Sequence, residues 1–230
     1  DLHSFPTRRS SDLPTVIYYF PSCNFKKAHA EVSEKICAYL TAKNVKILGC
    51  CRVSQDLLKE GDTILTNCTN CAIITNELSP NTQEKSVYEF ILEDDDFPWK
   101  DFHGEEISVQ DCWKSRKKAS AQNAVRKCLE KMNIKAVEIE ENFEKTKFCG
   151  IWNLSEVTPL NMKTAPRLFK EIGEKYTTVL SEEEKLKKMN EQVARHKTDR
   201  TLVYCNTCES GLKLGEGKPV HLAELISARL

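Results

Sequence analysis

The chain has 230 residues, with 34 basic and 34 acidic side chains, so its formal net charge is zero. Apolar residues make up 40% of the chain and charged residues 30%, which is typical of a soluble globular protein with one large domain or two small ones. Such a neutral chain is a poor general partner for nucleic acid or an anionic membrane. No apolar run approaches the roughly 18–20 residues that span a bilayer, so we expect no transmembrane segment.

Eleven cysteines are many for a chain of this length. Residues 1–13 are polar and lack the apolar core of a secretion signal, so we expect a cytoplasmic protein, in which disulfides are uncommon. The odd number of cysteines also suits a disulfide framework poorly. Metal binding or redox chemistry is therefore the better expectation for these thiols.

The first residues stand apart from the rest of the chain. The stretch 1–13 resembles a translated sequencing-adapter scar, and we expect it to be a non-native leader. The remaining chain divides near Gly104, after an acidic segment that we expect to be a solvated linker. The expected domains are therefore a first module over 14–104 and a second module over 105–230.

The first module alternates strands, cysteines and helices. Apolar and β-branched runs predict strands at 16–20, 45–48 and 63–66. Helices are predicted at 28–43, 53–60, about 71–77 and 87–92. The cysteines that follow the three strands are Cys23, Cys50, Cys51, Cys68 and Cys71. Because the carboxyl ends of parallel strands line one crevice, these five thiols can converge there.

The second module repeats this plan, with an insertion at 151–180. Strands are predicted at 107–109, 134–139 and 201–204, and helices at 119–132, 181–196 and 221–226. The cysteines at the strand ends are Cys112, Cys149, Cys205 and Cys208. The predicted fold is α/β, with two tandem related Rossmann-like modules whose cysteine clusters lie at strand carboxyl ends and face one another. Cys37 and Cys128 lie on helices and are expected in the core.

The number of thiols differs between the two modules. Five thiolates exceed the four of a tetrahedral zinc site or an ordinary cubane cluster, so the first module needs an extra ligation point or leaves one cysteine free. The second module has four thiolates, the number that a zinc site or a cubane cluster requires. Side chains beside the two CxxC motifs have two interpretations, as helix caps or as hydrogen-bond donors to a cluster: Asn67, Asn70, Asn206 and Thr207.

The doubled order of a single cysteine, a Cys-Cys pair and a CxxC motif resembles the cysteine-rich CCG domain family, whose best-known member is the cysteine-rich subunit of heterodisulfide reductase. The resemblance extends from Val16 to Ile226. It implies that a complete motif binds a noncubane [4Fe-4S] cluster through five cysteines. The first cluster would then have the ligands Cys23, Cys50, Cys51, Cys68 and Cys71, and the second site Cys112, Cys149, Cys205 and Cys208.

Two positions depart from the family pattern. Arg52 follows the first Cys-Cys pair in place of glycine, and Phe148 replaces the first cysteine of the second pair. The second, degenerate site therefore has four thiolates, which suit a cubane [4Fe-4S] cluster or zinc.

The resemblance implies an iron–sulfur redox subunit. It would receive electrons from an iron–sulfur or flavin subunit and pass them to a small-molecule disulfide or another small acceptor. Two alternatives remain open from the residues: a non-enzymatic zinc-stabilised binding module, and a thioredoxin-like dithiol enzyme that uses a CxxC motif. The basic run 114–118, directly after Cys112, is either a solvated helix start or a counter-charge for an anionic cluster or substrate.

Overall fold

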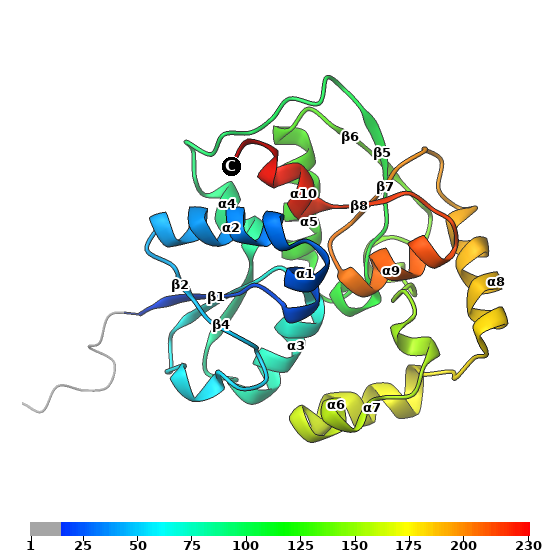
Figure 1. The fold of residues 1–230 in the computed structure, drawn as a ribbon, viewed down its shortest axis with the longest axis horizontal. Coiled ribbons are helices and arrows are strands. Elements are labelled where there is room, and N and C mark those ends of the chain that lie inside the picture. The colour runs from blue at the N-terminus through cyan, green and yellow to red at the C-terminus, as the bar shows by residue number, and fades with distance from the viewer. Residues whose placement is uncertain (1–14) are drawn as a thin grey trace, which may run out of the picture.

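The computed structural model describes residues 15–230, apart from the side chains of residues 171–175. It contains two α/β modules, each built on a parallel four-stranded sheet (Figure 1). The strand order is β2-β1-β3-β4 in the first module and β6-β5-β7-β8 in the second, so the second sheet repeats the first. The predicted fold of two tandem Rossmann-like modules is confirmed. The predicted leader, residues 1–13, lies outside the described residues.

The first module places its two most apolar strands at the centre of the sheet. β1 (Ile17–Phe20) pairs with β3 (Thr63–Thr66) along its whole length. The outer strands are β2 (Lys46–Ile47) and β4 (Gln83–Ser86). The helices of this module are α1 (Cys23–Ala28), α2 (Ala30–Ala42), η2 (Gln55–Leu57), α3 (Thr69–Leu78) and α4 (Val87–Leu92).

The second module follows the same order, with the insertion between β6 and β7. Its strands are β5 (Glu106–Val109), β6 (Lys135–Glu138), β7 (Thr201–Val203) and β8 (Pro219–His221). The helices before the insertion are η3 (Trp113–Ser115), α5 (Ala119–Lys131) and η4 (Phe143–Lys145). The later helices are η5 (Trp152–Leu154), α6 (Pro159–Thr164), α7 (Pro166–Tyr176), α8 (Glu182–Val193), α9 (Asn206–Leu214), α10 (Leu222–Ile226) and η6 (Ser227–Arg229).

The insertion crosses to the first module. Its helix α7 packs against α3, and Phe169 is buried in a cluster with Phe20 and Ile64 from the first sheet. Figure 1 shows α6 and α7 at the lower edge of the molecule, beside the first module. Helix α8 begins with the capping box that Ser181 predicts, in which Ser181 and Glu184 exchange hydrogen bonds.

The predicted helix over 53–60 is wrong. The chain there forms only η2, because Val53 is 77% and Leu57 57% exposed, so no buried apolar face stabilises a longer helix. Strand β4 was not predicted, since its sequence Gln-Glu-Lys-Ser has no apolar run. As an edge strand it needs only its neighbour β3, and a polar side-chain pattern is tolerated there.

One hydrophobic core continues across both modules. It includes Leu65 and Ile91 from the first module and Val125 and Leu202 from the second. Helix α4 of the first module packs against α5 of the second, and α10 of the second packs against α2 of the first. Cys128 is fully buried in this core, whereas Cys37 is half-buried and packs against its edge. The two modules therefore fold against each other as one unit.

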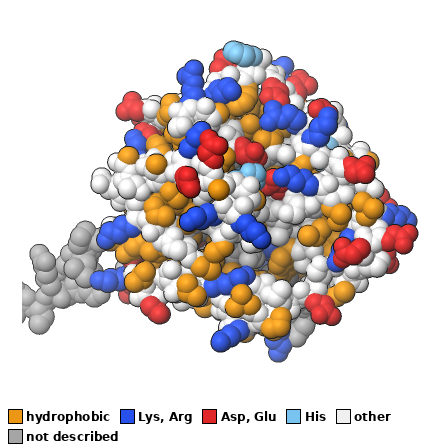
Figure 2. Space-filling view, viewed as in Figure 1, with side chains coloured by type: hydrophobic (Ala, Val, Ile, Leu, Met, Phe, Trp, Pro, Cys, Tyr) orange, Lys and Arg blue, Asp and Glu red, His pale blue; other side chains and the backbone are white. Residues whose placement is uncertain are grey.

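The surface agrees with the neutral composition. On the face that Figure 2 shows, acidic and basic side chains are interspersed rather than gathered by sign. Among the helices that the structure describes, none has both the length and the apolar character required to cross a membrane.

A buried carboxylate fixes the loops that carry two of the cysteines. The side chain of Asp111 accepts hydrogen bonds from Arg126 Nη1 at 2.6 Å and Nη2 at 2.9 Å, and from the Tyr204 hydroxyl at 2.7 Å. Arg126 also pairs with Glu138 at 2.8 Å. Asp111 and Tyr204 directly precede Cys112 and Cys205, so this network sets the separation of the two loops.

The substitution Arg126→Met should lower the free energy of unfolding by about 3 kcal/mol, because it leaves the Asp111 carboxylate buried without its counter-charge. Urea unfolding followed by circular dichroism measures the change. Arg195→Met is the matched control: Arg195 pairs with Glu141 on the surface, and its loss should cost less than about 1 kcal/mol. Equal costs for the two variants would contradict a structural role of the Asp111 network.

Candidate metal centre at the module boundary

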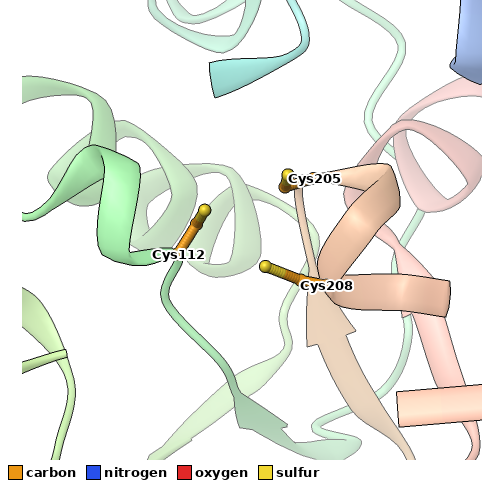
Figure 3. Close-up of side chains that lie close together, drawn as sticks. All are labelled: Cys112, Cys205 and Cys208. Atoms are coloured by element: carbon orange, nitrogen blue, oxygen red, sulfur yellow. The ribbon is translucent and has the colours of Figure 1, made fainter. Parts of the chain in front are cut away.

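The second module brings three thiols together. The sulfur atoms of Cys112, Cys205 and Cys208 all lie within 4.8 Å of one another, and Figure 3 shows them converging from two segments of the chain. Cys112 follows β5, Cys205 follows β7, and Cys208 lies in the first turn of α9. All three are buried. This separation permits one metal ion to bind all three sulfurs.

Cys149 lies against the same group. The neighbouring Cys112 thiol lowers the pKa of Cys149, and the positive charge of Lys114 adds to this effect. The pKa of Cys205 is also well below its usual value, because the thiols of Cys112, Cys208 and Cys68 stabilise its thiolate. The four residues predicted for the second site are therefore neighbours in the structure, and two of their thiols favour the charged form that binds metals.

The five predicted residues of the first module line one cavity. Cys23, Cys50, Cys51, Cys68 and Cys71 surround a space of about 120 Å³. Cys23 is exposed and Cys50 half-buried, whereas the other three are buried. The Cys71 thiol lowers the pKa of Cys51, and the Arg52 guanidinium contributes further. Arg52 thus adds a positive charge where the family pattern has glycine.

The two cysteine groups meet at Cys68 and Cys205. Contact with the Cys205 thiol raises the pKa of Cys68 to about 11. The Thr69 hydroxyl lies 3.5 Å from the sulfur atoms of both Cys112 and Cys205. The first cysteines of the two CxxC motifs are therefore in contact across the module boundary, and the thiols of both modules form one continuous group.

A buried lysine lies beside this boundary. Lys114 is only 6% exposed, and its Nζ has no hydrogen-bond partner among the described residues. The ammonium lies 3.8 Å above the ring of Trp152. Burial alone would lower the pKa of Lys114, but the nearby thiols, led by Cys149 and Cys205, raise it overall. A solvated helix start is therefore wrong for Lys114, although Lys117 in the same run is exposed.

Other polar atoms near the thiols also lack partners. Cys68 and Cys205 are the N-cap residues of α3 and α9, and neither helix has a side-chain cap among the described residues, so the capping interpretation of the neighbouring asparagines is wrong. Within the described structure, the buried side-chain atoms without a hydrogen-bond partner include Arg52 Nε, both amide atoms of Asn67 and of Asn206, and Asn70 Oδ1. The Thr207 hydroxyl lies 3.1 Å from the Cys205 sulfur.

A close backbone contact positions Cys149. Gly150 has φ of +59°, and a Cβ atom there would lie 1.7 Å from the backbone oxygen of Thr207. A Cβ at Gly211 would in turn lie 2.7 Å from Gly150 Cα. Only glycine permits the Cys149 loop to lie this close to α9. The contact holds Cys149 beside the CxxC motif of the second module.

A second group of possible metal ligands was not predicted from the sequence. His29 Nε2 lies 2.8 Å from Glu209, and His29 Nδ1 lies 3.9 Å from Glu224. Both carboxylates have other partners, since Glu209 pairs with Lys213 at 2.6 Å and Glu224 accepts from the His221 backbone at 2.8 Å. We interpret the group as a polar network that joins the modules. The separation of His29 from Glu209 by 180 positions leaves no local sequence signal.

Comparisons with known proteins give little information about function. No family model matches the chain, and no curated protein matches it. Among solved structures, the aspartate racemase of Picrophilus torridus is similar over 94% of this chain and 92% of that chain, with 12% identity and a TM-score of 0.32. A likeness this weak carries no argument about activity. The resemblance to the CCG family therefore stays a prediction, and the functional argument rests on the residues of the site.

The substitution Gly150→Ala should lower the free energy of unfolding by about 2 kcal/mol or more, because the new Cβ adds a backbone clash to the strain of a positive φ. Gly104→Ala is the matched control. Gly104 has φ of +79° but nothing within 4 Å of its Cβ position, so only strain of about 1 kcal/mol is expected. Chemical denaturation of both variants measures the difference. Equal losses would show that the close contact at Gly150 is unimportant.

Proposed function

We propose that the chain is an iron–sulfur redox subunit whose centres are held by the cysteines at the module boundary. The observation that carries this proposal is the continuous group of thiols around the buried ammonium of Lys114. The first centre would be a noncubane [4Fe-4S] cluster held by Cys23, Cys50, Cys51, Cys68 and Cys71. The second would be a cluster held by Cys112, Cys149, Cys205 and Cys208.

The donor set suits such a group. Thiolates are the preferred ligands of iron–sulfur clusters and zinc, whereas magnesium and calcium prefer oxygen. Cys112, Cys205 and Cys208 are already close enough to share one metal, and no disulfide joins any of the described cysteines. Neighbouring thiols lower the pKa values of Cys51, Cys149 and Cys205 and raise those of Cys68, Cys71 and Cys112, so these cysteines interact with one another and are not packed singly in the core.

The unpartnered donors also suit an anionic centre. A buried ammonium without a counter-charge costs on the order of several kcal/mol, so Lys114 requires negative charge nearby. The unpartnered N–H groups of Asn206 and Arg52, which line the cavity of the first group, have the same need for acceptors. Cluster sulfur atoms accept hydrogen bonds, and such bonds tune the reduction potential. An inorganic cluster with a net negative charge would therefore satisfy several buried groups at once.

The chain's own residues would control access to the two centres. When bound, an iron–sulfur cluster supplies one-electron transfer. The second group is buried and excludes water, whereas Cys23 is exposed on the first. Trp152 lines the cavity of the first group and covers Lys114 of the second. We propose that electrons arrive from an iron–sulfur or flavin subunit and leave to a small-molecule disulfide or another small acceptor at the more open first group.

A second candidate function is a zinc-stabilised binding module. The observation that favours it is the buried set Cys112, Cys149, Cys205 and Cys208, since four thiolates without an open position are the usual ligands of structural zinc. The first group does not fit this alternative, because its five thiols exceed tetrahedral coordination and one is exposed.

Anaerobic purification with iron, acid-labile sulfide and zinc analysis tests the proposal. We expect roughly four irons and four sulfides for each filled site and no zinc. Cys71→Ser should remove the metal of the first site and Cys208→Ser that of the second, because each replaces a proposed ligand. Cys37→Ser is the control, since Cys37 is half-buried at the edge of the core and should leave the metal content unchanged. Zinc without sulfide would overturn the redox proposal.

The charge of Lys114 should be visible in the reduction potential. Lys114→Met removes a cation beside the proposed centres, so the added electron is less stabilised and the midpoint potential should fall. Lys114→Arg keeps the charge and should stay close to the parent chain. A reductive titration followed by electron paramagnetic resonance measures both.

The stability of the Lys114 variants separates this electrostatic role from a purely structural one. In the metal-free chain Lys114→Met should change the free energy of unfolding little, because the cost of burying the ammonium and its attraction to the neighbouring thiols oppose each other. Unchanged potentials in both variants, or a loss of stability in the methionine variant without a change of potential, would contradict the electrostatic role.

A further inference from the structure

A second cavity, distinct from the one that the first cysteine group lines, reaches the point where the two groups meet. It has a volume of about 300 Å³ and lies between the modules. The first module contributes Asn67, Cys68 and Tyr88 to its wall, and the second contributes the segment 114–121. A molecule in this cavity would lie beside Cys68, the thiol that contacts Cys205.

The cavity wall contains buried polar groups without protein partners. Tyr88 is 2% exposed, and its hydroxyl has no hydrogen-bond partner among residues 15–230. The side-chain nitrogen and oxygen of Asn67 also have no partner there. Each unsatisfied buried group costs about 1–3 kcal/mol, so such groups usually have a bound water, ion or ligand as partner. Burial keeps the Tyr88 hydroxyl protonated by raising its pKa, so it can donate a hydrogen bond.

The opposite wall carries positive charge. Helix α5 has 13 residues, begins without a side-chain cap and has no acidic residue in its first turn. Its first residues, Ala119, Ser120 and Ala121, line the cavity. Because they form the first turn, their backbone N–H groups have no acceptor within the helix. The helix dipole favours an anion at this end, and Lys117 adds a charge at the rim.

The acidic side chains in the wall already have partners. Glu84 accepts from the Thr66 hydroxyl at 2.9 Å and forms an ion pair with Lys118. Glu89 accepts from the Ser86 backbone at 2.9 Å in the capping box of α4. Because these carboxylates are neutralised or hydrogen-bonded, the start of α5 remains open to a negatively charged group.

We infer that this cavity binds a small molecule with a carboxylate or phosphate group. The oxyanion lies at the start of α5, and the Tyr88 hydroxyl and the Asn67 amide bind polar atoms further inside. The far end of the molecule approaches Cys68. The binding site is inferred from the residues of the cavity alone. The role of the bound molecule as the electron acceptor rests on the proposed function.

Equilibrium dialysis of the full chain with inorganic phosphate and, separately, succinate tests the site. Ser120→Glu is the decisive variant. A glutamate in the first turn interacts favourably with the helix dipole, so this variant should fold. Its carboxylate, however, would occupy the position that we assign to the anion. We expect saturable binding of one probe by the parent chain and about tenfold or more weaker binding by this variant. Asn123→Glu, exposed one turn further along α5 and outside the cavity, is the matched control and should bind as the parent does.

Tyr88→Phe separates ligand binding from stability. Because the Tyr88 hydroxyl has no protein partner, its removal should not destabilise the free chain. Succinate or phosphate should then raise the thermal midpoint less in this variant than in the parent chain. A loss of stability without ligand, with unchanged ligand stabilisation, would contradict a binding role for Tyr88.

The two probes distinguish the kinds of ligand. Binding of phosphate alone indicates a phosphate ester, and binding of succinate alone indicates a carboxylate. Binding of neither probe below about 10 mM, or equal binding by the parent and Ser120→Glu, would overturn the inference. Metal and sulfide content, measured on the same samples, reports on the proposed function independently, so either proposal can fail while the other stands.

Discussion

The buried charge of Lys114 is the constraint on which the arrangement of the site depends. A buried ammonium is stable only where negative charge surrounds it, and in this chain the nearest candidates are thiols from both modules. Those thiols come together because strand ends, the Asp111 network and the Gly150 contact fix their loops. The anionic centre that we propose at the module boundary would give the buried cation and the unsatisfied N–H groups a common partner.

Much of the fold could be predicted from local sequence pattern. The apolar residues of strands β1 and β3 and of helix α4 predict these elements, and the structure has them with apolar side chains packed in the interior. The failures occurred where this signal is weak or misleading. Strand β4 is polar because it lies at an edge, and the segment 53–60 looks helical but has no core to pack against. Helix α1 begins at Cys23, where a loop was expected.

The sequence predicts which cysteines gather in each module and that the two groups face one another, but not which residues of the two groups are in contact. Cysteines at strand ends predict convergence within a module, because parallel strands share one carboxyl edge. The contact of Cys68 with Cys205 depends instead on how α4 packs against α5, which no local pattern encodes. The burial of Lys114 was unpredictable for the same reason, since the neighbouring Lys117 has a similar sequence context and is exposed.

The packing of the modules is reciprocal. Helix α4 of the first module meets α5 of the second, while α10, the counterpart of α4, meets α2, the counterpart of α5. Contacts of this kind define an isologous interface, the form that closes a dimer of identical chains around a twofold axis. Cys68 and Cys205, equivalent residues in contact, lie where such an axis would pass. The cations break this symmetry: Lys114 corresponds to Phe25 in the first module, and Arg52 corresponds to Gly150 in the second, so each half carries its positive charge at a different place.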